Sequence, residues 1–352
     1  MVTLPGLIDP HTHPRGLPTD DYKEDFYTAT ASALAGGFTT ILDMPNNPFT
    51  PTLTYELLVA KQTIAKKKVV CDIGFIFGTN GKNLEEFEKA AKLSLGLKVF
   101  LSFSTANLII DHATLKKVCE KWPNHLPILL HAEEDTIEEA LEIIKQTGHR
   151  AHICHVSSQY ELEQIIKAKE KGIQVTCGVT PHHLFLNETA MQTLGAYARM
   201  KPLLKSQKNV DFLWEHFKNI DIIESDHAPH TKEEKESSTP PFGVPGLETT
   251  LPLLLTAMHE GRISKEDIID KCYTRPKEIF HLPDQPDTYT EVDENEEWKI
   301  ENGKLHTKSN WSPFDGWKVT GKVKRVVLRG KKVFEEGKIL AQAGSGKIIT
   351  EH

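Results

Sequence analysis

The stretch of residues 127–179 reads PILLHAEEDTIEEALEIIKQTGHRAHICHVSSQYELEQIIKAKEKGIQVTCGV. It contains three short apolar or β-branched runs, at residues 127–130, 151–154 and 174–179. Charged segments separate these runs, and in them apolar residues recur every three or four positions. Such runs predict buried strands of a parallel sheet, and the segments between them predict amphipathic helices. The stretch is therefore predicted to form consecutive βα units.

The same alternation continues on both sides of this stretch. Further runs that predict strands lie at residues 3–9, 39–43, 69–77, 97–101 and 220–225. Together with the first three they make eight runs, with helix-like segments such as residues 57–67 and 113–121 between them. Eight strand–helix units favour a closed (β/α)8 barrel over an open doubly wound sheet.

The C-terminal part of the chain has a different pattern. From residue 289 onward, short segments predict antiparallel strands, which we expect to pack beside the first residues of the chain. The sequence therefore predicts a barrel over residues 1–288 and a small β-rich appendage over residues 289–352. The segment 232–241, KEEKESSTPP, is predicted to be a mobile loop.

Composition and charge exclude several classes of protein. The 352 residues are 39% apolar and 26% charged, which is typical of a globular enzyme and excludes collagen-like and disordered chains. The net charge of −7 gives no general attraction to nucleic acid or to an anionic membrane. The apolar runs are far shorter than the roughly 20 residues of a membrane span, and the N-terminus lacks a signal-peptide pattern. Five cysteines without C-x-x-C spacing favour a reducing, cytoplasmic location.

Two histidines follow the first predicted strand in the sequence His11-Thr12-His13. Because side chains alternate along a strand, both imidazoles face the same side and can share a metal ion. A single H-x-H pair is also compatible with two ordinary polar residues at a strand end. Lys98 lies within the apolar run 97–101, where an unpaired ammonium is costly to bury. Lys98 therefore needs a partner or a modification.

Six candidate groups lie in or at the ends of predicted strands: His11, His13, Lys98, His131, His155 and Asp226. The carboxyl ends of barrel strands form one rim, so these groups are expected to converge although they are far apart in sequence. Nitrogen and oxygen donors without a thiolate suit zinc or a similar ion. A catalytic ion takes about three protein ligands, so six donors are sufficient for two ions.

The motifs His11-x-His13-x-Arg15, Lys98, His131, His155 and Asp226-His-Ala-Pro-His230 resemble, in order and spacing, the amidohydrolase superfamily and within it the dihydroorotases. The resemblance covers nearly the whole chain. Within this group, the chain most resembles the dihydroorotase domains of animal multifunctional pyrimidine-synthesis proteins. The segments that carry this closer resemblance are 4–9, 44–46, 181–186, 245–249 and 324–329.

This resemblance implies a binuclear zinc centre. The amine of Lys98 is then carboxylated, and the resulting carbamate and a hydroxide bridge the two ions. His11 and His13 are implied as ligands of one ion and His131 and His155 as ligands of the other. Asp226 is implied both as a metal ligand and as the general acid and base. The implied reaction is the reversible cyclisation of N-carbamoyl-L-aspartate to (S)-dihydroorotate and water, in the synthesis of UMP.

The resemblance also implies a set of substrate-binding residues, namely Arg15, Asn46, Ser104, Thr105, His230 and Gly243. The guanidinium of Arg15 is expected to bind the substrate carboxylate. His230 and the backbone of Gly243 are expected against the ring, and the loop with Ser104 and Thr105 is expected to close over it. A surface salt bridge for Arg15, a turn position for Asn46 and an ordinary loop at residues 101–107 are the alternatives.

Two positions depart from the animal-type pattern. Gly178 stands where those relatives carry a glutamate, which makes an additional metal site that depends on this carboxylate doubtful. Lys201 stands where they carry an arginine, and a lysine cannot bind a carboxylate in a bidentate manner. We therefore expect weaker substrate binding.

Other functions remain open at this stage. A dihydropyrimidinase (hydantoinase) or an allantoinase shares the metal motifs, but a neutral ring substrate needs no cation at position 15. A non-catalytic scaffold for aspartate transcarbamoylase is a further alternative, although it has no need of a buried lysine among histidines. The resemblance favours a homodimer and allows association with aspartate transcarbamoylase.

Overall fold

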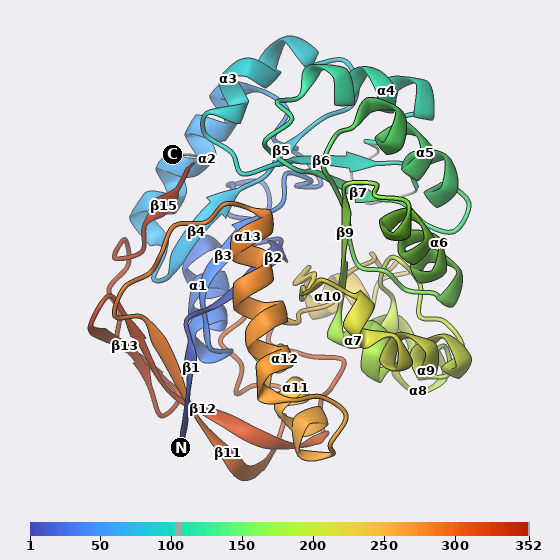
Figure 1. Ribbon diagram of the computed structural model, residues 1–352. Helices are drawn as coiled ribbons and strands as arrows, with labels where there is room; N and C mark the ends of the chain where they lie inside the picture. Colours follow the sequence, from blue (N-terminus) through green and yellow to red (C-terminus); the bar gives the residue numbers. More distant parts are fainter. Residues whose placement is uncertain (103–107, 351–352) are drawn as a thin grey trace.

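The computed structural model describes residues 1–102 and 108–350, and these form the predicted β/α barrel (Figure 1). The barrel strands, in chain order, are β2 (Leu7–Thr12), β3 (Phe38–Asp43), β4 (Asp72–Phe75), β5 (Phe77–Gly78), β6 (Leu97–Phe100), β7 (Ile128–His131), β8 (Ala151–Ile153), β9 (Val175–Val179) and β10 (Ile222–Ile223). All of their pairings with one another are parallel. β4 and β5 are separated by one residue and together correspond to the single predicted run 69–77.

The ring of strands closes between its first and last members. β2, β3 and β4 form one series of neighbours, and β5 to β10 form the other. A parallel bridge between Thr12 and His227 joins the end of β2 to the residues after β10. The carboxyl ends of the first and last strands are therefore adjacent, although more than 200 positions separate them in sequence.

Helices cover the outside of the barrel. The longer ones are α1 (Phe26–Ala35), α2 (Tyr55–Lys68), α4 (His112–Lys121), α5 (Ile137–Thr147), α6 (Gln159–Glu170), α9 (Gln207–Glu215) and α11 (Leu247–His259). Shorter helical segments are η1 (Leu84–Glu86), α3 (Phe87–Ala91), α7 (Pro181–Phe185), α8 (Ala190–Leu194), η2 (Gly195–Ala198), η3 (Phe217–Asn219), α10 (Lys232–Lys235), α12 (Lys265–Ile269), η4 (Asp270–Thr274) and α13 (Arg275–Ile279).

The local sequence explains where α5 and α6 begin and end. α6 starts after Ser158, whose side chain accepts a hydrogen bond from the amide of Glu161, while the Glu161 side chain bonds back to the cap. α5 ends at Gly148, which has a φ of 65°, a conformation that glycine adopts without strain. The inward face of α5 buries Ile137, Leu141 and Ile144 at helical spacing.

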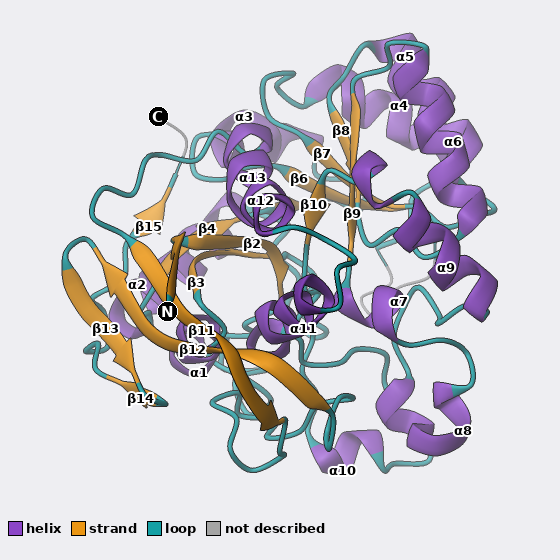
Figure 2. Ribbon diagram, turned by 60° about the horizontal axis from the view of Figure 1, so that its bottom comes forward, coloured by secondary structure: helices purple, strands orange, loops and turns teal. Residues whose placement is uncertain are grey.

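The appendage is a five-stranded antiparallel sheet beside the barrel (Figure 2). Its strand order is β1 (Val2–Pro5), β11 (Tyr289–Lys299), β12 (Lys318–Leu328), β13 (Lys331–Glu335) and β14 (Lys338–Ile339). The predicted strand 3–9 is thus two strands, because the chain passes from the appendage to the barrel at Gly6. A Cβ at Gly6 would lie 2.4 Å from Thr39 Oγ1, so this crossing requires glycine.

The division of the chain at residue 288 stays a prediction, because each sheet takes strands from both sides of it. β1 belongs to the appendage sheet, as the sequence pattern predicts. By contrast β15 (Ile348–Ile349) returns to the barrel and pairs in parallel with β4.

The segment 232–241, which the sequence predicts as a mobile loop, begins instead with the short helix α10. A capping box between Thr231 and Glu234 starts this helix, and Lys235 at its end is buried. The prediction of a loop was therefore wrong for residues 232–235, since the charged composition gives no sign that Lys235 is buried, whereas residues 236–241 form turns and irregular structure.

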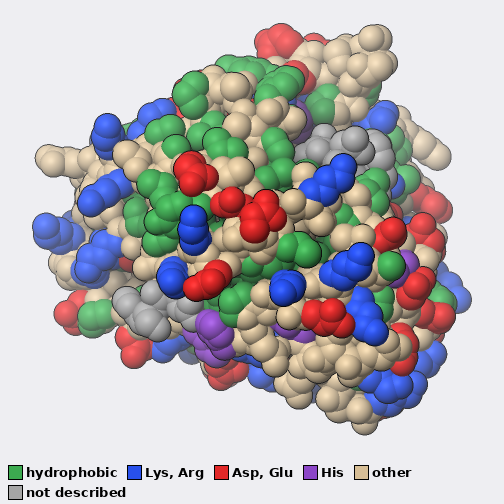
Figure 3. Space-filling model, turned by 90° about the horizontal axis from the view of Figure 1, so that it is seen from above, with side chains coloured by type: hydrophobic (Ala, Val, Ile, Leu, Met, Phe, Trp, Pro, Cys, Tyr) green, Lys and Arg blue, Asp and Glu red, His purple; other side chains and the backbone are tan. Residues whose placement is uncertain are grey.

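None of the described helices has both the length and the apolar character that crossing a lipid bilayer requires. On the face shown in Figure 3, acidic and basic side chains are interspersed with apolar ones.

Candidate metal centre and substrate pocket

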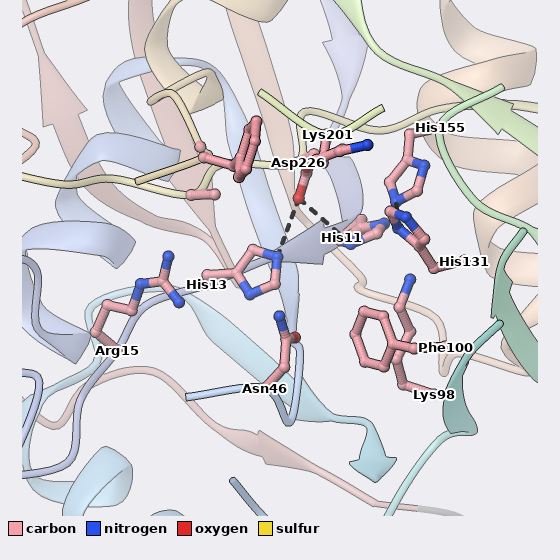
Figure 4. A pocket seen from close by; sticks show the side chains of 13 residues that line it. His11, His13, Arg15, Asn46, Lys98, Phe100, His131, His155, Lys201 and Asp226 are labelled. Atoms are coloured by element: carbon pink, nitrogen blue, oxygen red, sulfur yellow. Dashed lines mark hydrogen bonds and ion pairs between the residues drawn. The ribbon is translucent and has the colours of Figure 1, made fainter. Parts of the chain in front are cut away.

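A pocket at the carboxyl-end rim of the barrel brings most of the predicted site residues together (Figure 4). All six candidate ligands line it, and so do Arg15, Asn46 and Gly243. His230 is buried directly behind Gly243, since a Cβ at Gly243 would lie 3.2 Å from His230 Cδ2. Ser104 and Thr105 lie outside the described residues, so their predicted role stays a prediction.

One half of the pocket is built by His11, His13 and Asp226. The two imidazoles extend from the end of β2, and the carboxylate follows β10 (Figure 4). Asp226 Oδ1 lies 3.0 Å from His13 Nε2 and 3.4 Å from His11 Nε2. Three potential ligand atoms thus converge within one buried cluster, which can hold a metal ion.

The electrostatics of this half favour a bound positive charge. Burial by itself raises the pKa of Asp226, but His11 and His13 outweigh it and hold the pKa below its usual value. Burial lowers the pKa of His13 to about 3, which favours the neutral imidazole that metal ligation requires. Burial and Lys98 also lower the pKa of His11, but Glu224, Cys154 and Asp226 together raise it to about 10. His11 therefore binds either a proton or a metal ion, and metal binding would displace the proton.

Glu224 lies behind His11 and orients it. Its Oε2 is 3.1 Å from His11 Nδ1, and its Oε1 accepts a hydrogen bond from the backbone amide of His155. His152 Nε2 lies 3.7 Å from the same carboxylate. With Nδ1 directed at Glu224, the Nε2 atom of His11 faces the pocket, as expected for a metal ligand whose other nitrogen is held by a carboxylate.

The other half of the pocket contains His131 at the end of β7 and His155 after β8. His131 Nδ1 lies 3.0 Å from His155 Nε2, and His131 Nε2 lies 3.3 Å from Glu133 Oε1. Burial lowers the pKa of both imidazoles, and neighbouring cationic groups lower that of His155 further. His155 Nδ1 is buried and has no hydrogen-bond partner within the described part of the chain. Lowered pKa values favour the neutral imidazoles that metal ligation requires, and the unpartnered nitrogen of His155 fits a cation site.

Lys98 on β6 lies beside these imidazoles and is only 1% exposed. Its Nζ is 3.0 Å from Cys154 Sγ and 5.2 Å from the centre of the Phe100 ring. Cys154 lies in an apolar cluster, and its sulfur also contacts Lys98. A thiol and a ring are weak partners for a buried ammonium, which fits a lysine that is modified in the functional protein.

Three site residues have a backbone conformation that is rare for residues other than glycine. The φ angles are 62° for Arg15, 39° for His155 and 43° for Asp226. Such strain persists only where surrounding structure enforces it, and it gathers at functional sites. The three residues follow β2, β8 and β10, so the strained backbone lies just after the carboxyl ends of barrel strands.

Arg15 and Asn46 form the substrate side of the pocket. Arg15 is 2% exposed, and neither its Nε nor the Oδ1 atom of Asn46 has a hydrogen-bond partner among residues 1–102 and 108–350. Asn47 Nδ2 donates to the carbonyl of Arg15 at 2.5 Å, and Lys61 Nζ donates to Asn47 Oδ1 at 2.8 Å. The backbone of Arg15 is thus held in place, and the Nε atom of its guanidinium is left available to an anionic ligand.

Sequence reasoning missed several residues of this site. Glu224 and Glu133 contact candidate ligands, and Phe242 lines the pocket. Glu224 lies two positions before Asp226 and Glu133 two positions after His131, which is the only signal that the sequence offered. The Glu224 carboxylate also fills the space beside Gly178, where a Cβ would lie 2.6 Å from Glu224 Cδ. A side chain at position 178 is therefore incompatible with this arrangement of Glu224.

A closed β/α barrel with buried imidazoles and a carboxylate at the carboxyl-end rim is an architecture of metal-dependent hydrolases. The model of the amidohydrolase family matches residues 2–261, and the chain belongs to this family.

Individual relatives extend this assignment. The chain is 44% identical over 352 residues to the multifunctional protein CAD of Squalus acanthias, with 99% of the chain aligned, and it spans 16% of the length of that relative. It is 34% identical to a dihydroorotase of Pyrococcus horikoshii, over 99% of the chain and 85% of the relative. Among solved structures, an L-hydantoinase (dihydropyrimidinase) from Arthrobacter aurescens superimposes with a TM-score of 0.94 at 26% identity, over 99% of this chain and 89% of that one.

Proposed function

We propose that the chain is a dihydroorotase, which reversibly cyclises N-carbamoyl-L-aspartate to (S)-dihydroorotate and water in pyrimidine biosynthesis. Relatives of similar length carry this name and align over nearly the whole chain. The observation that carries the proposal is the buried guanidinium of Arg15, which lines the pocket and lacks a partner at Nε. Dihydroorotate presents a carboxylate that this guanidinium can bind.

The cofactor is proposed to be a pair of zinc ions. His11, His13 and Asp226 would hold one ion, and His131 and His155 would hold the other. Addition of CO2 to the neutral amine of Lys98, with loss of a proton, would give an anionic carbamate whose two oxygens can serve as metal ligands. The unpartnered Nδ1 of His155 and the weak partners of Lys98 support this arrangement. When bound, the ions supply Lewis-acid activation of water and of the substrate carbonyl.

The residues of the chain then handle the proton and the substrate. Asp226 Oδ1 lies within 3.4 Å of the Nε2 atoms of His11 and His13, and the lowered pKa of Asp226 keeps its carboxylate ionised, which a proton acceptor must be. In the hydrolytic direction it would pass this proton to the ring nitrogen that leaves, and in the biosynthetic direction the transfer is reversed. A general acid or base of this kind contributes about 10²- to 10⁴-fold in rate.

Substrate orientation rests on the opposite wall of the pocket. Arg15 would bind the spectator carboxylate, and Asn46 would add a contact from its side-chain amide. His230 and the backbone of Gly243 would contact the ring from the segment after β10. Because these groups come from rigid rim segments, the reacting amide is held against the metal side of the pocket.

An assay of metal-replete protein tests the function. The substrates are N-carbamoyl-L-aspartate, dihydroorotate, dihydrouracil, hydantoin and allantoin. We expect interconversion of the first two and little turnover of the other three. Turnover of dihydrouracil without turnover of dihydroorotate would overturn the assignment.

A second candidate is a cyclic-amide hydrolase of the hydantoinase type, favoured by the superposition on the Arthrobacter aurescens enzyme. The buried cation at Arg15 argues against it, because a neutral ring cannot compensate the charge of a guanidinium removed from water. The same assay separates the two candidates.

We also propose that the chain forms a homodimer and can associate with an aspartate transcarbamoylase in the cytoplasm. The association is supported by the similarity to a multifunctional relative of which this chain spans 16%. The homodimer rests on the family resemblance alone. Light scattering of the isolated chain, with and without an added transcarbamoylase, measures both associations.

A further inference from the structure

Lys235, the last residue of α10, is a buried lysine outside the candidate metal centre. Its side chain is fully buried, and its Nζ forms no ion pair with a carboxylate in the part of the chain that the structure describes. Instead Nζ donates to the carbonyl oxygens of Arg199, Pro241 and Gly243, each at 3.0 Å. An ammonium has three donors, so these three acceptors satisfy it completely.

The three carbonyls belong to two segments that are distant in sequence. Arg199 lies in the segment before α9, while Pro241 and Gly243 follow α10. A backbone bond from Gly243 N to Arg199 O, also 3.0 Å long, joins the same two segments. Lys235 therefore holds the two segments together. Removing its side chain would take one hydrogen bond from each of three carbonyl groups, of which that of Gly243 is buried and the other two are partly buried.

Both segments carry residues that line the substrate pocket, namely Lys201, Phe242 and Gly243. The guanidinium carbon of Arg199 lies 4.2 Å from the centre of the Phe242 ring, and Lys201 Nζ lies 5.8 Å from it. The backbone packs tightly here, since a Cβ at Gly243 would lie 2.5 Å from the carbonyl oxygen of Ala228. A small shift of either segment therefore changes the shape of this pocket wall.

Trp311, in the connection between β11 and β12, packs against Lys235. Lys235 Nζ lies 5.5 Å from the centre of the Trp311 ring, and Trp311 Nε1 donates to the carbonyl of His230 at 2.7 Å. The indole thus contacts both the ammonium and the backbone of a predicted substrate-binding residue. Burial and the nearby guanidinium of Arg199 lower the pKa of Lys235 to about 7.

We propose that Lys235 is a positioning residue that holds the wall of Lys201, Phe242 and Gly243 in the conformation that binds substrate. The inference rests on the proposed function only for the identity of the substrate. Lys235 does not line the pocket itself, so its effect reaches the substrate through the backbone it binds.

The test compares Lys235→Met, which keeps the length of the side chain and removes the donors, with Lys232→Met, an exposed lysine on the same helix. For Lys235→Met we expect KM for dihydroorotate to rise about ten-fold or more, since the wall loses a set of buried hydrogen bonds. The value of kcat should stay within about three-fold and metal content should not change, because the bonds of Lys235 go to the substrate wall. Lys232→Met should behave as the wild type in all three measurements.

Hydrogen exchange of the substrate-free protein gives a readout that does not depend on activity. The amide of Gly243 should exchange slowly in the wild type, and faster in Lys235→Met but not in Lys232→Met. A folded Lys235→Met variant with wild-type KM and exchange would overturn the proposal. If that variant does not fold, wild-type exchange at Gly243 as fast as at the exposed residues 237–239 would overturn it as well. Absence of dihydroorotate turnover in the wild type would instead refute the proposed function and leave the exchange test intact.

Discussion

Glu224 Oε2 lies 3.1 Å from Nδ1 of His11, and neither residue is more than 1% exposed. This contact fixes which nitrogen of His11 faces the pocket. The same carboxylate also accepts from the backbone amide of His155, so one buried glutamate links both halves of the candidate metal centre.

Replacement of Glu224 tests this link. We expect Glu224→Gln to lower metal affinity or activity by about 10- to 100-fold, as is typical when the group that orients a metal ligand is lost. Metal content by elemental analysis and kcat with dihydroorotate are the measurements. Glu248→Gln is the control, because Glu248 is a partly buried glutamate that accepts from the backbone amides of His306 and Thr307. Equal metal affinity in the two variants would contradict the orienting role.

Lys98 is expected to be essential for the metal centre. Lys98→Ala should lose both metal and activity, since no other described side chain at this position can supply two bridging oxygens. Lys92→Ala, at an exposed position shortly before the same strand, should retain both. Mass spectrometry under native conditions should show one added carboxyl group in the wild type and none in Lys98→Ala. Full metal binding by Lys98→Ala would exclude the carbamate.

Arg15 is expected to decide substrate choice. For Arg15→Met we expect KM for dihydroorotate to rise about 10- to 100-fold, the effect of losing a hydrogen-bonded charge pair, with metal content unchanged. Slow turnover of the neutral substrate dihydrouracil should be unaffected or improved. A steady-state comparison of the two substrates measures this difference, and equal losses for both would show that Arg15 is structural.

Asp72 is expected to couple the appendage to the barrel. Its carboxylate lies 2.6 Å from Arg329 Nη1 and 2.8 Å from Gln285 Nε2, and it accepts from the amide of Lys347 at 2.8 Å. Asp72→Asn should lower the free energy of unfolding by roughly 1–3 kcal/mol while kcat is maintained. Denaturant unfolding followed by fluorescence provides the measurement. Two separate transitions in the wild type would support the division at residue 288, whereas a single transition would show that the two parts unfold together.

The positions of the candidate ligands were predictable because barrel geometry places every strand end at one rim. A histidine or aspartate directly after an apolar run can be located without a structure, as with His131, His155 and Asp226. The residues that contact these candidate ligands could not be predicted in this way. Glu224, Glu133 and Cys154 are ordinary residues in the sequence, and only their distances to His11, His131 and Lys98 give them a role.

The burial of Lys235 also could not be predicted from the sequence. Its surroundings in the sequence are charged and rich in serine and proline, a composition that indicates an exposed loop. The fold places the ammonium against three carbonyl groups and an indole, which no local pattern encodes. Burial of a single side chain depends on which distant segments surround it.

The sequence by itself determined the alternation of strands and helices, the barrel that follows from eight such units, and the types of donor at the strand ends. These features are local, since periodicity and strand-end position depend on residues close together in the chain. The tertiary structure alone decided which nitrogen of His11 faces the pocket, how Gly178 leaves room for Glu224, and where the chain crosses between sheets at Gly6. These depend on contacts of a few ångströms between residues up to 213 positions apart, and such contacts exist only once the barrel has closed.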